Sequence, residues 1–334
     1  MDFTLTEEQE LLRETARGLL GRECPSTLVR AHWNDPSVIE PVWDRHLREW
    51  VALGDGPLVD HCLFLEEAGR VLLPGPYFAT SALFLPLLRA LSDPDVDAVA
   101  AGELSGTVAL AGRDGLWHAA PPAEPIRRFV PEVDRVDRVA IVLPGPSVAV
   151  VPAPALTMRP METLDSTRRL FELEVPPDLE SVPVSTGTLT AVLERATIAL
   201  AAEMVGTVRW LVDTSVSYSK QRVQFDRPIG SFQGLQFKMV DMSLDLERAT
   251  AAVYYAAMAF DADDPDRHRA AHVAKAAAGA AARRAAKDAV QIHGGIGYTW
   301  ECDVHLFLRR AYASEYLLGS SAWHHDRLAD QLLA

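Results

Sequence analysis

Apolar residues recur at helical spacing in the first hundred residues of the chain. Leu12, Ala16 and Leu19 form one stripe, and the two acids before it, Glu7 and Glu8, suit the positive end of a helix dipole. Similar stripes predict three further helices, at about residues 39–53, 58–71 and 80–91. We therefore expect a helical N-terminal domain over residues 1–101.

The pattern changes between residues 102 and 183, where short runs of β-forming residues are separated by many prolines. The runs cover residues 107–111, 139–143, 148–151 and 171–175. Short runs of this kind, bounded by turn residues, predict strands. Because the runs are few and short, we expect a small, abbreviated β-domain here.

From residue 184 to 334 the apolar pattern becomes helical again. It predicts four long helices with short connections, at about residues 190–221, 233–260, 268–290 and 304–333. Four antiparallel helices joined by short loops make a bundle. The expected fold is therefore mostly helical with a small central β-domain, in the order helical domain, β-domain, four-helix bundle.

The segment QIHGGIGY, residues 291–298, follows the most Ala-rich of these helices. A glycine pair after a helix is typical of a left-handed C-cap, because Gly adopts positive φ without a Cβ clash. The alternative is that bare backbone at Gly294 and Gly295 lets a ligand approach closely, with the Gln291 amide beside it. These residues alone leave both interpretations open.

A second motif, RVQFDRPIGSFQ, occupies residues 222–233. Together the patterns RxQFxxPIxxFQ and QxHGGxGYTxE resemble the C-terminal domain of the acyl-CoA dehydrogenase family. The segments EEAGRVLLPGPYFAT, residues 66–80, and LDSTRR, residues 164–169, are similar to that family as well. The resemblance implies the same three-part fold, an FAD cofactor and an acyl-CoA substrate.

The resemblance also implies which residues hold the nucleotide end of FAD. They are Arg222, Gln224, Phe225, Gln291, Gly294 and Gly295. A guanidinium is a bidentate phosphate ligand, and an aromatic or amide group beside it can contact the adenosine. In the family these contacts reach the FAD of a neighbouring subunit, so they imply an oligomer. The alternative is that Arg222 caps its own helix, with Phe225 in the core.

The chain departs from the family pattern in three places. Asp226 stands where the family often has Gly, and it adds a negative charge that Arg227 beside it can offset. The TEPxxGSD-like and WIT-like stretches that bind the flavin ring are missing, and the nearest segment, residues 110–118, keeps a Trp without the pattern. The family's catalytic Glu aligns with Leu318, which has no titratable group.

Other acids are weak substitutes for that base. The family's alternative base position holds Ala196, and Glu194 is rotated from it by roughly 200° around the helix. Glu315 lies three residues before Leu318, close enough in helical phase to replace it. The favoured alternative is that Glu315 is a solvated acid near Arg309 and Arg310, because Glu is mostly exposed in proteins. We therefore assign no catalytic residue to this chain.

Composition limits the classes of binding partner and the cellular compartment that we expect for this protein. The 334 residues carry a formal net charge of −14, which argues against nucleic acid as a partner. No apolar run reaches the roughly 20 residues of a membrane span. Three scattered cysteines and an acidic start without signal-peptide features favour the cytoplasm. His324–His325–Asp326 lacks further spaced ligands, so we expect it at the surface, without a metal.

The chain keeps the nucleotide-binding motifs of the family but lacks its flavin-ring motifs and its catalytic Glu. This combination favours the small subunit of a heteromeric acyl-CoA dehydrogenase. The larger partner subunit would then supply the flavin pocket and the Glu base. Such αβ assemblies occur in the family among actinobacterial enzymes acting on steroid-derived acyl-CoA thioesters, and the steroid assignment is analogy alone. Two alternatives stay open: a self-sufficient homo-oligomeric enzyme with a relocated base, and a non-catalytic interaction protein on this fold.

Overall fold

The computed structural model describes residues 4–120 and 122–333, which form two compact units. The first, here called the bundle unit, comprises the segment ending at Gly21, the segment Cys62–Leu73 and the segment from Leu200 onward. The second, the β unit, comprises Arg22–His61 and Pro74–Ala199. The N-terminal helices are thus divided between the units, and the expected boundaries at residues 101 and 183 stay a prediction.

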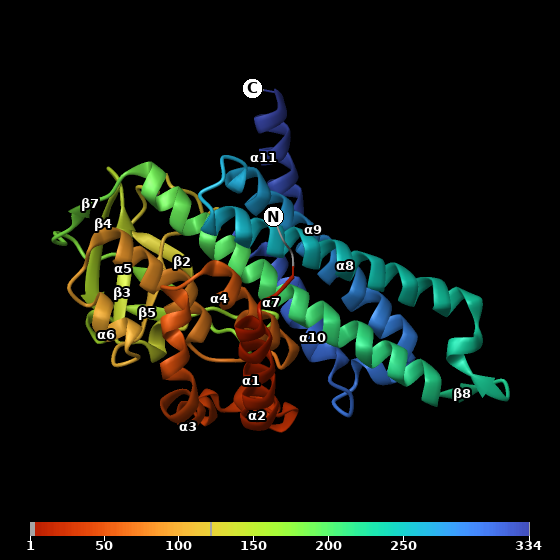
Figure 1. Cartoon of the computed structure of the whole chain (residues 1–334). Coiled ribbons are helices and arrows are strands. Elements are labelled where there is room, and N and C mark those ends of the chain that lie inside the picture. The colour runs from red at the N-terminus through yellow and green to blue at the C-terminus, as the bar shows by residue number, and fades with distance from the viewer. Residues whose placement is uncertain (1–3, 121, 334) are drawn as a thin grey trace. The chain divides into compact units, whose positions relative to one another are not determined.

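Long helices run side by side in the bundle unit (Figure 1). They are α7 (Thr186–Gln221, in this unit from Leu200), α8 (Gln233–Asp261), α9 (Arg267–His293) and α10 (Val304–Tyr316). Most of α1 (Glu7–Glu23) and of α4 (Leu58–Arg70) belongs to the same unit. The helical periodicity of the sequence therefore predicted the bundle correctly.

Glycines let α4 and α7 touch backbone to backbone. A Cβ on Gly69 would lie 1.9 Å from the carbonyl oxygen of Glu203, and one on Gly206 would lie 1.8 Å from that of Glu66. Both distances are far below contact, so neither position accepts a side chain without moving a helix. The crossing also carries ion pairs, including Glu66 with Arg209 at 2.7 Å.

The last expected helix, residues 304–333, is wrong in one respect, because it is broken in two. α10 ends at Tyr316, and α11 (Ser321–Leu333) begins after a turn. In that turn Leu318 and Gly319 take φ values of 58° and 95°. Positive φ at two consecutive residues ends a right-handed helix, and only Gly adopts it without a steric penalty.

The β unit holds two small sheets. One has the order β1–β3–β4–β7, formed by Gly106–Ala109, Arg138–Leu143, Ser147–Pro152 and Val182–Pro183. The other has the order β2–β6–β5, formed by Ile126–Pro131, Leu170–Glu174 and Met158–Pro160. The β1–β3 pair is parallel, with Thr107 opposite Val139, and the other pairs are antiparallel. The four strands expected from sequence are β1, β3, β4 and β6.

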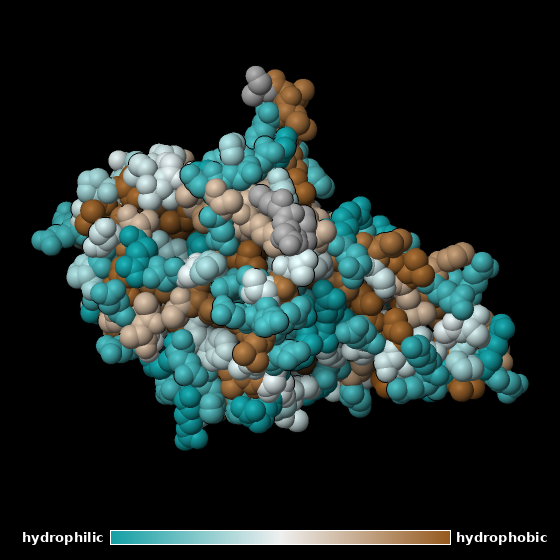
Figure 2. Space-filling model, in the orientation of Figure 1, coloured by the Kyte–Doolittle hydropathy of each residue, from teal (hydrophilic) through white to brown (hydrophobic). Residues whose placement is uncertain are grey.

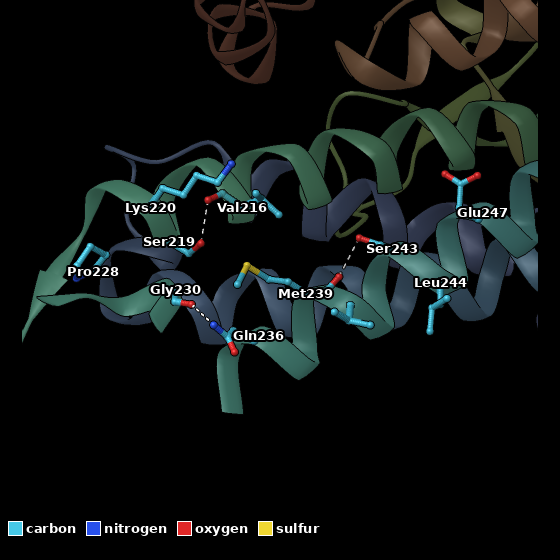
Figure 3. A pocket seen from close by; sticks show the side chains of 11 residues that line it. Val216, Ser219, Lys220, Pro228, Gly230, Gln236, Met239, Ser243, Leu244 and Glu247 are labelled. Carbon is cyan, nitrogen blue, oxygen red and sulfur yellow. Dashed lines mark hydrogen bonds between the residues drawn. The ribbon is translucent and has the colours of Figure 1, made fainter. Parts of the chain in front are cut away.

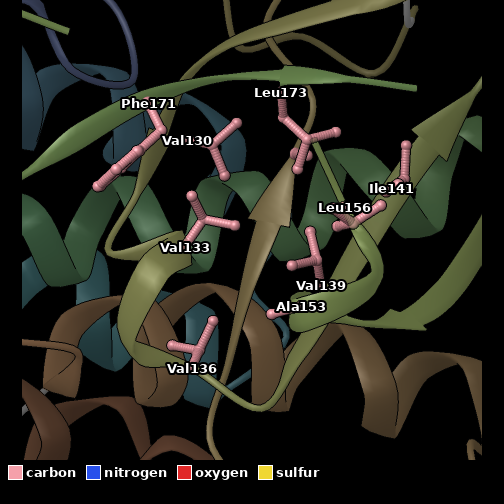
Figure 4. Packing of buried hydrophobic residues seen from close by; sticks show 10 residues of the cluster. Val130, Val133, Val136, Val139, Ile141, Ala153, Leu156, Phe171 and Leu173 are labelled. Atoms are coloured by element: carbon pink, nitrogen blue, oxygen red, sulfur yellow. The ribbon is translucent and has the colours of Figure 1, made fainter. Parts of the chain in front are cut away.

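The apolar side chains of both sheets meet in one core. Val139 and Ile141 of β3 pack with Val130 of β2 and with Phe171 and Leu173 of β6, all at most 3% exposed (Figure 4). Alternate residues of a strand point to one face, so each sheet contributes every second residue. This core gives the β unit its own hydrophobic centre.

Strand β2 escaped prediction because it contains Arg127 and Arg128. The Arg127 side chain is 1% exposed, and its guanidinium donates to the carbonyl oxygens of Val142 at 2.8 Å and Glu124 at 2.6 Å. Burial lowers the pKa of this guanidinium. A buried arginine held by main-chain carbonyls satisfies its donors inside a sheet, which hydrophobic patterning cannot anticipate.

The helical part of the β unit is less regular than expected. The chain from Pro36 to Gly54 alternates short 3₁₀, α and π turns in place of one helix, and α2 (Ser26–Asn34) precedes it. The expected helix 80–91 is a π turn, Ala79–Phe84, that continues into α5 (Leu85–Leu91), followed by α6 (Val96–Ala100). In the described residues, no helix combines the length and apolar character needed to cross a membrane.

Candidate nucleotide-binding site

The segment after α7 forms a tight hairpin at one end of the bundle unit (Figure 1). Strand β8 (Val223–Gln224) pairs with β9 (Arg227–Pro228), and Gln224 lies opposite Arg227. The backbone N–H of Ile229 donates to the Arg222 carbonyl at 2.8 Å and closes the hairpin base. Arg222 and Gln224 are both exposed there.

Two residues connect the strands, and both are strained. Phe225 and Asp226 have φ values of 53° and 61°, as a two-residue turn of this handedness requires. Gly and Asn suit such positions, whereas a residue like Phe adopts them at a cost. The turn presents Phe225 to solvent with 85% of its surface exposed, so its expected alternative, a core position, is wrong.

A cation packs against the aromatic residues at the tip of the hairpin. The rings of Phe225 and Phe232 meet edge to face with centroids 6.0 Å apart, and the Arg227 guanidinium lies 4.2 Å from the centre of the Phe232 ring. Arg227 therefore stabilises the tip through its ring contact. In the described part of the chain it makes no ion pair with Asp226.

The end of α9 carries the second group of candidate residues. The helix runs to His293, and Gly294 follows as its C-cap with φ of 67° and ψ of −146°. The positive φ suits glycine, but this ψ differs from that of the expected left-handed cap. Gly295 does not share that conformation, and a Cβ there would meet nothing within 4 Å. Neither strain nor crowding within the chain thus calls for glycine at position 295, and a group from outside the chain would explain it.

The structure brings the two motifs together through one ring pair. The Tyr218 ring, one turn before the end of α7, stacks on the His293 ring with centroids 4.3 Å apart and planes 22° from parallel. His293 is buried and donates from Nδ1 to the Ala289 carbonyl at 2.8 Å. Burial lowers the pKa of His293, which favours the neutral ring in this stack.

All six residues implied in nucleotide binding are exposed around this junction. They are Arg222, Gln224 and Phe225 from the hairpin, and Gln291, Gly294 and Gly295 from the end of α9. Within the described residues the Arg222 guanidinium has no ion pair or hydrogen bond, whereas Arg310 pairs with Glu203 at 2.7 Å. An unpaired guanidinium beside an exposed amide and bare backbone is suited to a phosphate.

The position expected to hold the base lies in the turn between α10 and α11. Leu318 is 3% exposed, and three hydrogen bonds from two buried side chains fix the turn around it. Lys275 Nζ donates to the carbonyls of Glu315 at 3.0 Å and Gly319 at 2.7 Å, and His324 Nε2 donates to that of Leu318 at 2.9 Å. Burial lowers the pKa of Lys275 to about 8. The sequence reading missed Lys275 because a lysine on an Ala-rich helix usually faces solvent.

Glu315 is not the solvated acid that the sequence suggests, because its side chain is buried in the fold and 1% exposed. Its carboxylate accepts the backbone N–H of Ser321 at 3.0 Å and the Ser321 hydroxyl at 2.9 Å. It also fills the space above Gly279, where a Cβ would lie 2.0 Å from Oε2. Glu315 therefore holds the first residue of α11 in place. Of the other positions considered for a base, Ala196 is fully buried and Glu194 is 8% exposed.

His324 is likewise buried, which corrects the expected surface position, while His325 and Asp326 are exposed. Its Nδ1 lies 2.8 Å from Nδ1 of His272. Because Nε2 donates to a carbonyl, His324 Nδ1 accepts and His272 donates. Burial, with Lys275 nearby, lowers the pKa of His324 to about 3, so the ring stays neutral.

A groove of about 740 Å³ lies beside the hairpin, between the end of α7 and the start of α8 (Figure 3). Val216 and Met239 line it together with Pro228 and Gly230 of the hairpin motif. Along α8, Phe237, Val240 and Leu244 are 60%, 54% and 63% exposed. Sequence reasoning missed this surface. The signal that could have revealed it is that α8 has apolar residues on its outward face as well as on the face that packs inward.

Comparison with known proteins gives a family match first for the C-terminal helices and then for nearly the whole chain. Residues 187–333 match the model of the acyl-CoA dehydrogenase C-terminal domain. The chain is 34% identical over 333 residues to acyl-CoA dehydrogenase IpdE2 of Mycobacterium tuberculosis, covering 95% of each protein. It is also 35% identical to acyl-CoA dehydrogenase FadE34 of the same organism, of which the match covers 37%.

Solved structures agree over the full length. The steroid ACAD Tcur3481–Tcur3483, as a G363A variant, superposes with a TM-score of 0.84 at 26% identity and covers 99% of both chains. A chain of the ChsE4–ChsE5 complex from Mycobacterium tuberculosis superposes with a TM-score of 0.85 at 22% identity, covering 100% of this chain and 99% of that one. On the sequence identity over nearly its whole length, this chain belongs to the acyl-CoA dehydrogenase family.

Proposed function

We propose that this chain is the small subunit of an FAD-dependent acyl-CoA dehydrogenase that removes the α- and β-hydrogens of an acyl-CoA thioester. In this proposal the chain holds the nucleotide end of FAD. A larger partner subunit of the same family supplies the flavin-ring pocket and the Glu base. The activity belongs to the assembly.

The observation that carries the proposal is the exposed group of residues around the Tyr218–His293 junction. Arg222 has no partner among the described residues, and Gly295 has no reason within the chain to be glycine. Both features are expected if another subunit brings a phosphate-bearing cofactor to this surface. A bidentate guanidinium would then neutralise the pyrophosphate, while the bare backbone allows close approach.

The division of labour follows from the chemistry of the reaction. When bound, flavin would supply the acceptor for the β-hydride, and the reaction would also need a carboxylate to take the α-proton. Leu318 cannot take a proton, and the Glu315 carboxylate is already engaged by Ser321. The residues of this chain therefore bind and orient the cofactor, and the proton acceptor comes from elsewhere in the assembly.

The exposed face of α8 fits the need for a partner. Figure 2 shows apolar residues gathered over the bundle, in the region where Figure 1 labels α8. Phe237, Val240 and Leu244 follow one another at helical spacing, and the groove beside them runs up to the hairpin. A contiguous exposed apolar surface of this kind is typical of a protein–protein interface.

We place the enzyme in the cytoplasm and among enzymes of lipid degradation, with a steroid-derived acyl group as the leading candidate. Support for the acyl group comes from a similar structure that is described as a steroid ACAD. Support for the compartment comes from three free cysteines, Cys24, Cys62 and Cys302.

The test is the native mass and the flavin absorbance of the chain, purified alone and after co-expression with larger acyl-CoA dehydrogenase subunits. We expect little flavin in the chain alone and a yellow mixed oligomer with the right partner. Arg222→Gln should deplete flavin from that oligomer without dissociating it, and Arg269→Gln, an exposed arginine paired with Asp266, is the matched control.

A stoichiometric flavin content in a homo-oligomer that oxidises an acyl-CoA would contradict the shared-site proposal and favour a self-sufficient enzyme. A mixed oligomer whose flavin content is unchanged by Arg222→Gln would favour the non-catalytic alternative, in which the fold is kept for assembly alone.

A further inference from the structure

Most of the positive charges in the bundle unit are engaged with carboxylates. Arg310 pairs with Glu203 at 2.7 Å, and Lys238 pairs with Asp288 at 2.6 Å. The chain has 46 acids and 32 lysines and arginines, so we expect most of its cations to have an acid within ion-pair distance. A cation that stays unpaired is therefore a feature to explain.

Lys287 is such a cation. Within residues 4–120 and 122–333 its ammonium makes no ion pair and no hydrogen bond, and the residue is exposed. Its immediate neighbour Asp288 is buried and turned to Lys238. Within the described residues Lys287 thus has no acid to pair with on the exposed face of α9, where Arg283 precedes it by one turn.

That face leads directly to the candidate nucleotide site. The exposed residues Val273, Ala280, Lys287 and Gln291 follow one another along α9 at helical spacing and end at Gly294 and Gly295. Lys287 is one turn before Gln291, which places their Cβ atoms roughly 6 Å apart on the same face. A lysine side chain is long enough to bring its ammonium beside any group that contacts Gln291.

The electrostatics of the site call for another cation. Both α7 and α9 end here, and the C-terminal end of a helix carries partial negative charge. Asp226 adds a full negative charge on the hairpin tip. Among the described residues, Lys220, Arg222 and Arg227 are the cations without an ion pair at this end of α7, and the Arg227 guanidinium lies over the Phe232 ring. Lys220 and Arg222 would thus oppose these groups and a doubly charged pyrophosphate.

We propose that Lys287 is a further phosphate contact of this site, acting beside Arg222 on a nucleoside diphosphate group. The inference rests on the proposed function. The diphosphate has two sources in the reaction, because FAD and coenzyme A both contain an ADP unit. Lys287 acts as a point charge, and its role is to offset the negative helix ends so that the diphosphate binds at ordinary salt concentrations.

The experiment measures the Kd of FAD and of free coenzyme A for the assembled flavoprotein over a range of salt concentrations. Lys287→Gln should raise the Kd of one of the two ligands about tenfold and reduce its dependence on salt, since one charge-assisted contact is lost. Lys287→Arg should restore most of the affinity. Arg269→Gln removes the same charge at the far end of α9 and should leave both Kd values unchanged.

The ligand whose Kd changes identifies the source of the diphosphate. Unchanged Kd values for both ligands in Lys287→Gln would overturn the inference, and so would an equal loss in Arg269→Gln, which would show an effect of net charge alone. If Arg222→Gln raises the Kd of FAD while Lys287→Gln changes neither ligand, the proposed function survives and this inference fails. If Arg222→Gln has no effect on FAD, the proposed function itself fails.

Discussion

Tyr218 and His293 stack with their ring centroids 4.3 Å apart, and this contact joins the ends of α7 and α9. The two motifs that implied FAD binding are about seventy residues apart in sequence. The stack places them at one end of the bundle unit, with Arg222 after one ring and Gly294 after the other. The ring pair is thus the structural basis of the candidate site.

Removing the stack should separate the two halves of the site. We expect Tyr218→Ala to weaken flavin binding about tenfold and to cost about 1–3 kcal/mol in stability, because it removes an aromatic pair and its buried area. Tyr218→Phe keeps the ring and should behave as wild type. Flavin titration and chemical denaturation of both variants check this, and a normal flavin affinity in Tyr218→Ala would show that the stack does not align the site.

Replacing Asp226 should improve the hairpin in two separable ways. Asp226→Gly relieves the strain of φ 61° and removes a negative charge near the proposed phosphate. We expect a stability gain of up to about 1 kcal/mol and tighter flavin binding. Asp226→Ala removes the charge and keeps the strain, so it should tighten flavin binding without stabilising the protein. Equal flavin affinity in all three proteins would argue against a phosphate near this turn.

Glu132 should make the β unit less stable as the pH rises. It is 1% exposed, and burial raises its pKa to about 7, although its carboxylate accepts the Arg169 backbone N–H at 2.8 Å. Because the folded pKa lies above the unfolded value, the folded state favours the protonated form. The stability is complete below the unfolded pKa near 4.5 and is lost as the pH rises through 7.

The expected loss between pH 5 and pH 8 is on the order of 3 kcal/mol. Glu132→Gln keeps an oxygen for the Arg169 N–H but cannot ionise, so its stability should vary less over this range. Urea unfolding at pH 5 and pH 8, followed by tryptophan fluorescence, compares the two proteins. Parallel pH profiles would mean that another group controls the pH dependence.

Glu315 should act on stability and not on the chemical step. Glu315→Ala leaves Ser321 without its acceptor and opens a space above Gly279, which should cost about 2–4 kcal/mol. Glu315→Gln retains an oxygen toward Ser321 and should cost less. In the assembled enzyme, Glu315→Gln should turn over at a rate within a few fold of wild type. A loss of a hundredfold or more in a folded Glu315→Gln protein would identify Glu315 as the base after all.

Periodicity in the sequence was sufficient to predict the class of the fold. Long apolar stripes predicted the bundle helices, because a helix that packs on one side must repeat its apolar residues every three or four positions. Short runs of β-forming residues bounded by turn residues predicted β1, β3, β4 and β6. The sequence pattern failed to predict β2, where the buried Arg127 donates to the carbonyls of Val142 and Glu124. It also failed to predict the turn at residues 317–320, which Lys275 and His324 stabilise by hydrogen bonds to its carbonyls.

The motifs likewise named the candidate residues but not their surroundings. Arg222, Phe225 and Gly295 could be chosen from the sequence because their spacing matches a family pattern. Whether each lay buried or exposed, paired or unpaired, depended on contacts between residues far apart in the chain, as at Tyr218 and His293. Glu315 illustrates the limit most clearly. Its sequence neighbours suggest a solvated acid. In the folded chain Ser321 and Gly279 lie against its carboxylate, which is therefore buried and holds the start of α11. Local pattern determines which elements form, whereas the partner of each polar group is decided by tertiary packing.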